Sequence, residues 1–185
     1  MLAKYQQAIE QYRRQMFSFA YYSLRTREDA EDVLQDVFIR LWQHWRRIDH
    51  DKMGAWLMRT TRNAVVDHVR KRKSSRQHIT DELIEAEAPD VALPETDAFR
   101  ERLEIAIRDL PDPFRSIIIM RDVQGMSYLE IGHILELSQS QVKVYLHRGR
   151  RRLRENTALR QLAVDHELID ELDLKPAERV TKVTP

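Results

Sequence analysis

Apolar side chains recur at steps of three and four residues along most of this chain, which is the spacing of an amphipathic α-helix. The pattern predicts helices over about residues 4–24, 28–47 and 53–73, and no alternating strand pattern lasts long enough to compete. The predicted buried stripe of the second helix is the most regular, and it contains Ala30, Val33, Leu34, Val37, Phe38, Leu41, Trp42 and Trp45. We expect these helices to form one small domain over residues 1–76.

A second helical region begins near residue 100, stops at Pro111, and restarts at Phe114 until Gly125. Two capping boxes come next, in which a serine precedes a Glu or Gln by three residues: Ser127 with Glu130, and Ser138 with Gln141. Two short capped helices joined by a tight turn predict a helix-turn-helix. The expected fold class is therefore all-α, with a second domain over residues 100–157.

Charge is unevenly distributed, although the net charge is only +1. Residues 1–76 carry 16 basic and 9 acidic side chains, and residues 100–160 carry 12 and 8. Residues 77–99 carry 7 acidic and no basic side chains, and they include two prolines, so we interpret them as an acidic linker. Two basic blocks around an acidic one indicate two domains that face polyanions. Residues 158–185 form a C-terminal extension to which the sequence assigns no role.

Several classes of protein fit the sequence poorly. The absence of cysteine excludes disulfides and thiolate zinc sites, and no two histidines are three or four residues apart. No glycine-rich phosphate loop is present, and no apolar run is long enough to cross a membrane. We therefore expect a cytoplasmic protein that is not an enzyme, needs no metal or cofactor and does not insert into a membrane.

The last predicted helix of the second domain separates into two faces at 100° per residue. Val142, Leu146 and Leu153 point inward, whereas a small polar residue, a methyl-bearing residue and several cations point outward. The outward residues are Ser140, Lys143, Val144, His147, Arg151 and Arg154. Such groups read base edges and grip phosphates in a major groove, and we favour this interpretation over a merely solvated cationic helix.

Two further faces lie in the first domain. The third helix presents an indole, an amide and guanidiniums on one side, through Trp56, Arg59, Thr60, Asn63, Asp67 and Arg70. These groups suit single-stranded nucleic acid, but Trp56 could equally be core and Asp67 could simply pair with Lys71. The second helix exposes Ile39 among acids and amides, which could centre a docking patch for a basic, partly apolar protein. Its polar neighbours are Asp32, Gln35, Asp36 and Gln43.

Three segments together resemble an extracytoplasmic-function (ECF) sigma factor of the bacterial sigma-70 family. They are AEDVLQDVFIRLW (30–42), AWLMRTTRNAVVDHVRKRK (55–73) and SYLEIGHILELSQSQVKVYLHRGRRRLRE (127–155). The resemblance implies that the first domain binds the polymerase core and captures the melted −10 promoter strand, while the second reads the −35 element as duplex. It also implies RNA polymerase core, promoter DNA and an anti-sigma factor as candidate partners.

Combining the resemblance with the exposed faces gives three predicted sites. The polymerase-binding residues are Asp32, Gln35, Asp36, Phe38 and Ile39. The −10 DNA-binding residues are Trp56, Arg59, Asn63, Asp67, Arg70 and Lys71. The −35 DNA-binding residues are Ser140, Gln141, Lys143, Val144, His147, Arg148 and Arg151.

The chain departs from the family pattern at Gly132, where Ala is usual, at Glu136, where Gly is common, and at Gln141, where Thr is frequent. A left-handed conformation at Glu136 would cost about 1 kcal/mol. The alternative function is a stand-alone helix-turn-helix repressor or activator, whose N-terminal half dimerises or senses a signal. The exposed faces of the second and third helices favour the sigma factor.

Overall fold

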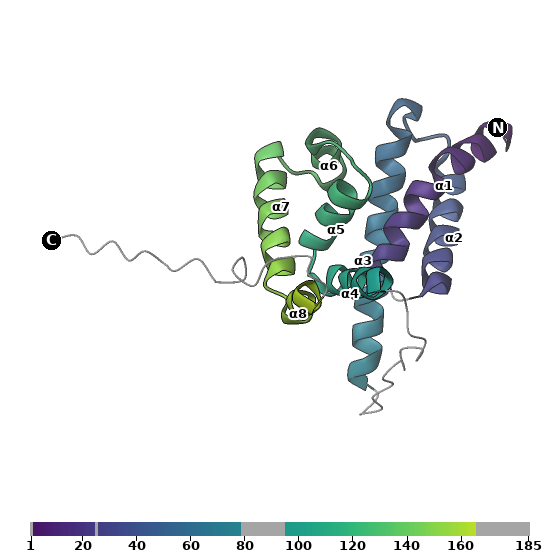
Figure 1. The fold of residues 1–185 in the computed structure, drawn as a ribbon. Coiled ribbons are helices and arrows are strands. Elements are labelled where there is room, and N and C mark those ends of the chain that lie inside the picture. Colours follow the sequence, from purple (N-terminus) through teal and green to yellow (C-terminus); the bar gives the residue numbers. More distant parts are fainter. Residues whose placement is uncertain (1, 25, 79–94, 166–185) are drawn as a thin grey trace.

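The computed structural model describes residues 2–24, 26–78 and 95–165, and the regular elements in these ranges are all helical (Figure 1). The first half of the chain contains α1 (Leu2–Ser23), α2 (Arg27–His44), the 3-10 turn η1 (His50–Lys52) and α3 (Met53–His78). The second half contains α4 (Glu95–Asp109), α5 (Phe114–Ile118), the π-helical turn η2 (Ile119–Val123), α6 (Tyr128–Leu135), α7 (Gln139–Arg154) and α8 (Thr157–Asp165). The predicted all-α fold with two helical domains is confirmed.

The long third helix and the fourth helix both extend into the segment predicted as a linker. α3 continues to His78 and α4 begins at Glu95, so both ends of the range 77–99 are helical. The carboxylates at positions 81–90 lie outside the described residues, as does the tail from residue 166 onward. The start of the C-terminal extension forms α8, in which Leu159 is buried.

The core of the first domain lies between α1, α2 and α3, as the periodicity predicts. Its fully buried side chains include Met16, Phe19, Ala20, Ala30, Val37, Leu41 and Leu57. Trp42 is a correction to the predicted stripe, because its side chain is 45% exposed. Its indole meets the Tyr5 ring edge-on, at 5.2 Å between ring centroids.

The core of the second domain depends on a local irregularity in the α5–η2 segment. Four consecutive side chains, Ile117, Ile118, Ile119 and Met120, are buried, which a regular helix with one apolar face cannot achieve. The helix widens into a π turn at this point, with the N–H of Gln124 donating to the carbonyl of Ile119 at 3.0 Å, and the segment is covered on more than one side. The segment thus faces α7 on one side and the first domain on the other.

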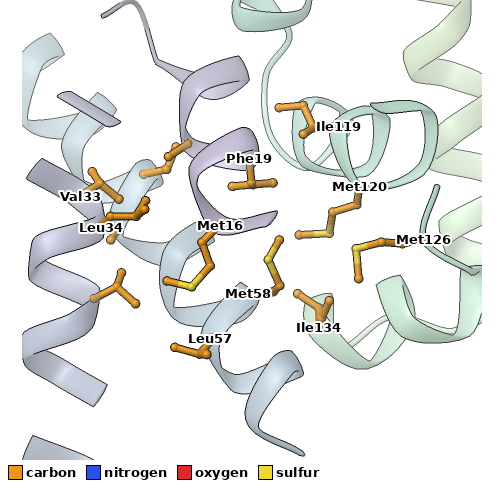
Figure 2. Close-up of a cluster of buried hydrophobic side chains, with 14 of the residues drawn as sticks. Met16, Phe19, Val33, Leu34, Leu57, Met58, Ile119, Met120, Met126 and Ile134 are labelled. Carbon is orange, nitrogen blue, oxygen red and sulfur yellow. The ribbon is translucent and has the colours of Figure 1, made fainter. Parts of the chain in front are cut away.

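The two domains pack directly against each other along a surface that we term the interdomain seam. It is defined by Met58 of α3 together with Met120, Met126 and Ile134 of the second domain, all of which are buried. Figure 2 shows these side chains in one cluster with Phe19 of α1. The Gln124 side chain also donates to the carbonyl of Gln15 at 2.8 Å. The seam therefore combines apolar packing with polar contacts.

Candidate nucleic-acid and polymerase interfaces

The helix-turn-helix consists of α6 and α7, and each helix begins with the predicted capping box. The Ser127 hydroxyl accepts the N–H of Glu130 at 3.2 Å, and the Ser127 N–H donates to the Glu130 carboxylate at 2.7 Å. Ser138 and Gln141 form the same reciprocal pair, at 3.2 and 2.8 Å. These bonds satisfy N–H groups that the first turn of a helix leaves without partners.

The turn between α6 and α7 places Glu136 in the left-handed region, at φ 57°. Gly132 makes this turn possible, because a Cβ at that position would lie 2.6 Å from the carbonyl oxygen of Leu137. The turn position where the resemblance leads us to expect glycine is thus occupied by Glu136 in the left-handed conformation.

The outward face of α7 is exposed at every position that the helical projection assigns to it. The exposed side chains are Ser140, Lys143, Val144, His147, Arg151 and Arg154, and Arg148, which the resemblance added, is exposed as well. Val144 is 47% exposed among these polar groups, so it offers the apolar contact that a thymine methyl would meet. Gln141 is exposed as well, but its side-chain oxygen is engaged in the capping box. The face can therefore contact both phosphates and base edges.

Four residues beside this face could not be predicted from the sequence. The Tyr128 ring lies under both the Arg121 guanidinium, at 4.7 Å, and the Lys143 ammonium, at 5.5 Å. Arg150 donates two hydrogen bonds to Asp122, at 3.0 and 2.5 Å, and this bonding raises the pKa of the guanidinium. The contacts join α7 to η2 and α6. Only the three-dimensional neighbours reveal them, since nothing local in the sequence links Asp122 to Arg150.

On α3, the predicted −10 residues are distributed between open and covered positions. Asn63, Arg70 and Lys71 are exposed, whereas Trp56 is half-buried with its ring 6.2 Å from that of His44. Asp67 pairs with Arg70 at 3.2 Å, so the alternative of an Asp67–Lys71 pair is not observed. The structure thus places an amide, a carboxylate-held guanidinium and an indole along one helix.

Two of the α3 arginines that have ion-pair partners, Arg72 and Arg59, are held by different parts of the molecule. Arg72 of the basic run lies 2.5 Å from the Asp29 carboxylate, which also lies 3.2 Å from His68 Nε2. Arg59 points across the interdomain seam and bonds to α6. The helical projection places Arg59 correctly on the outer face of α3, but it cannot show that the second domain covers this position.

The outer face of α2 lies beside this part of α3. Asp32, Gln35 and Asp36 are exposed, and Ile39 is 55% exposed among them. The polar side chains of the α2 face, those of Asp32, Gln35 and Asp36, line one hollow together with Asp67 and Lys71 of α3. The predicted polymerase-binding and −10 residues are therefore neighbours.

Two further details concern the apolar part of the α2 face. Phe38 is half-buried, packs on the core and accepts a hydrogen bond from the Tyr5 hydroxyl at its carbonyl, at 2.9 Å. Trp42 lies about one helical turn beyond Ile39 and extends the exposed apolar surface. Trp42 follows Ile39 by three residues, and this spacing in the sequence indicates that the two side chains are neighbours on the helix surface.

The described part of the chain meets the requirements of neither a metal site nor a membrane-spanning helix. Within the three described ranges, no set of three His, Asp or Glu side chains gathers as a metal site requires. Across those same residues, no helix combines the length and apolar character needed to cross a membrane.

Comparison with known proteins matches both halves of the chain to one family. Residues 8–75 match Sigma-70 region 2, and residues 100–153 match Sigma-70, region 4. The ECF RNA polymerase sigma factor SigM of Bacillus subtilis is 31% identical over 153 residues, which cover 78% of this chain and 90% of that protein. SigE of Mycolicibacterium smegmatis is 30% identical over 164 residues, covering 85% of this chain and 63% of that protein.

Two solved structures share the fold, each with a TM-score of 0.63. CnrH, in complex with the cytosolic domain of CnrY, is 21% identical, and the match covers 83% of this chain and 86% of that one. The sigma factor RpoE of Bartonella quintana, in complex with the anti-sigma factor NepR, is 23% identical over 82% of this chain and 95% of that one. Fold and sequence together define a sigma-70-type transcription initiation factor. The chain belongs to the ECF RNA polymerase sigma factors.

Proposed function

We propose that this chain binds RNA polymerase core and directs it to specific promoters by reading two DNA elements. The α2 face, with Asp32, Gln35 and Ile39, docks on the core. The outer side of α3, centred on Asn63, captures the melted −10 strand, and the outward face of α7 reads the −35 element as duplex.

The observation that carries the proposal is the arrangement of α7. A doubly capped helix-turn-helix presents an unbroken exposed arc of cations, small polar groups and one valine, while its opposite side is buried in the domain core. This is the composition of a major-groove reading surface. The neighbouring faces of α2 and α3 supply a protein-docking surface and stacking and hydrogen-bonding groups for unpaired bases.

The decisive experiment adds the purified full chain to sigma-free polymerase core and assays for transcription from defined start sites. We expect start-site-specific RNA with core and none without it. Stable duplex binding by a homodimer in the absence of core, with no stimulation of transcription, would instead support the stand-alone repressor or activator.

The partners implied by this function are polymerase core and promoter DNA, and the site of action is the bacterial cytoplasm, where transcription occurs. The complex of the related B. quintana protein with NepR supports proposing an anti-sigma factor as a further partner of this chain. Co-purification of a tagged copy of the chain from its own host, with and without added core, would test that proposal.

A further inference from the structure

Arg59, which we predict to contact the −10 strand, is held by the second domain. Its Nη2 donates to the carbonyl of His133 at 2.6 Å and its Nε to the carbonyl of Ile134 at 3.1 Å. Its Nη1 donates to the Glu136 carboxylate at 2.6 Å. All three nitrogen atoms of the guanidinium are thus engaged at the C-terminal end of α6, where carbonyl groups lack helical partners and the helix dipole is negative.

A second charged contact reinforces the first one. Arg62, one turn further along α3, pairs with Asp112 in the connection between α4 and α5. Its Nη1 also donates to the Asn63 side-chain oxygen at 3.2 Å. Behind both arginines the seam is apolar, since Met58 and Ile134 are buried against each other's domains (Figure 2). The two ion pairs therefore lie beside buried apolar packing between the domains, and neither is an isolated surface pair.

The turn residue that meets Arg59 is conformationally costly. A glutamate in the left-handed region persists only where the surrounding structure fixes it, because glycine would adopt the same backbone without penalty. Glu136 is exposed and its carboxylate has Arg59 as an ion-pair partner. The strain at this position therefore coincides with the ion pair that closes the seam.

We propose that the seam is an autoinhibitory contact, in which the end of α6 occupies Arg59 and competes with the −10 strand for it. The proposal rests on the proposed function of the α3 face. Asn63 is exposed in the closed form, so a strand can begin to bind there, but it gains Arg59 only when α6 moves away. The apparent affinity for single-stranded DNA is then reduced by the fraction of molecules that are closed.

The test changes the α6 side of the contact and leaves Arg59 intact. Glu136→Gln removes one ion pair, and adding Asp112→Asn removes a second one. In the native chain the Ser116 hydroxyl donates to Asp112 at 2.6 Å, and the amide oxygen introduced at position 112 can still accept this hydrogen bond. Glu136→Gly is a further variant, because it also relieves the strained turn.

The control variant combines Glu101→Gln with Glu10→Gln. It removes two exposed carboxylates, one on α4 and one on α1, that form no ion pair with any residue in the described ranges. Because both double variants change the net charge equally, a difference between them reports on the seam and not on general repulsion of DNA.

Two readouts are measured on the full chain. Binding of a fluorescent single-stranded DNA of mixed sequence, about 12 nucleotides long, is followed by anisotropy. The distance between spin labels on Gln43→Cys and Gln139→Cys is measured by pulsed EPR; both positions are exposed and the native chain has no cysteine.

We expect about threefold tighter binding for each Glu136 variant and about tenfold for the Glu136/Asp112 variant, as ion pairs of this kind suggest. The control should remain within about twofold of the wild type. The label distance should lengthen in the seam variants, and in the wild type when DNA is added.

Unchanged affinity and unchanged label distance in the Glu136/Asp112 variant would overturn the autoinhibitory contact while leaving the proposed function in place. DNA binding to the wild type without any change in label distance would overturn it as well. Failure of every variant to bind the DNA would contradict the proposed function of α3 itself, and this proposal with it.

Discussion

At the scale of single residues, the turn between α6 and α7 places two separate constraints on the backbone, one at Glu136 and one at Gly132. Glu136 takes the left-handed position without being glycine, and Gly132 provides the close approach to Leu137. A glycine inside a helix costs about 1 kcal/mol relative to alanine, so helix propensity alone would favour alanine at position 132. The turn therefore depends on the missing Cβ of Gly132.

Replacing Gly132 by alanine should lower the free energy of unfolding by about 1–3 kcal/mol, because the new Cβ would meet a backbone oxygen at 2.6 Å. Urea unfolding of the variant and the wild type provides the measurement. The matched control is His133→Ala, an exposed neighbour in the same helix whose substitution should cost less than about 0.5 kcal/mol. Equal stability of the two variants would show that the turn adjusts freely.

The capping box at Ser127 should make the stability of the second domain depend on acid pH. Hydrogen bonds from the Ser127 hydroxyl and then from its N–H lower the pKa of Glu130 from its ordinary value of 4.5. The carboxylate therefore contributes stability above about pH 4.5, and the contribution is lost as the pH falls through the lower folded pKa. Glu130→Gln should be less stable than the wild type at neutral pH and approach it in acid, as measured by urea unfolding at several pH values. A constant difference across pH would contradict this account.

At the scale of elements, α2 and α7 each present one face to the core and one to a proposed partner. The α2 outer face is acidic with an exposed Ile39, and the α7 outer face is basic with an exposed Val144. Opposite charges around a small apolar centre suit different partners, a basic protein surface for α2 and DNA for α7.

Replacing both Asp32 and Gln35 by lysine should weaken binding to polymerase core by about tenfold at low salt, because it reverses the charge of the docking face. Fluorescence titration of core with the labelled chain gives the affinity. The control is Glu10→Lys with Gln11→Lys, which makes the same chemical change at exposed positions of α1. If the two double variants bind polymerase core with equal affinity, the docking surface lies elsewhere on the chain.

Lys143→Ala and Arg151→Ala should each weaken binding to a −35 duplex and reduce the slope of log affinity against log salt by about 1, as expected for a lost phosphate contact. Arg152→Ala is the matched control, because that guanidinium lies over the Phe114 ring at 4.4 Å and not on the outward arc. Asn63→Ala should leave duplex binding unchanged and slow promoter opening. A salt slope that falls equally in all four variants would indicate a general charge effect.

The helices, both capping boxes and the exposed faces were predictable because they depend on residues within a few positions of one another. Trp42 and Arg59 were not, since projecting one helix does not show which other element covers a given side. Arg59 meets carbonyls more than seventy residues away along the chain. The π turn was also invisible to a search for regular periods, because the four consecutive buried residues 117–120 that lead into it fit no single apolar face.

At the scale of the whole molecule, the two domains share a buried cluster and are expected to stabilise each other. Met120 of the second domain packs in the same cluster as Met58 and Phe19 of the first (Figure 2). All three tryptophans, at positions 42, 45 and 56, lie in the first domain. Their fluorescence therefore reports on the unfolding of one domain only.

Met120→Ala should lower the free energy of unfolding by about 2–5 kcal/mol and shift the tryptophan-detected urea transition, although the substitution is in the other domain. Val142→Ala serves as the comparison, because Val142 is equally buried but belongs to the α7 side of its domain. Its effect on the tryptophan signal should be smaller. If Met120→Ala does not shift the urea midpoint detected by tryptophan fluorescence, the domains unfold independently.

The π turn makes the contact between the domains sensitive to chain length at one place. A π turn contains one residue more than the α-helical turn it replaces, and it absorbs that residue without changing the direction of the side chains that follow. A further residue inserted within Ile119–Val123 would not be absorbed and would rotate the downstream residues by about 100°. Met126 would then leave the seam even though every apolar residue type around it could be kept. Substitutions that keep apolar character and volume should thus be tolerated in this segment far better than a single inserted residue.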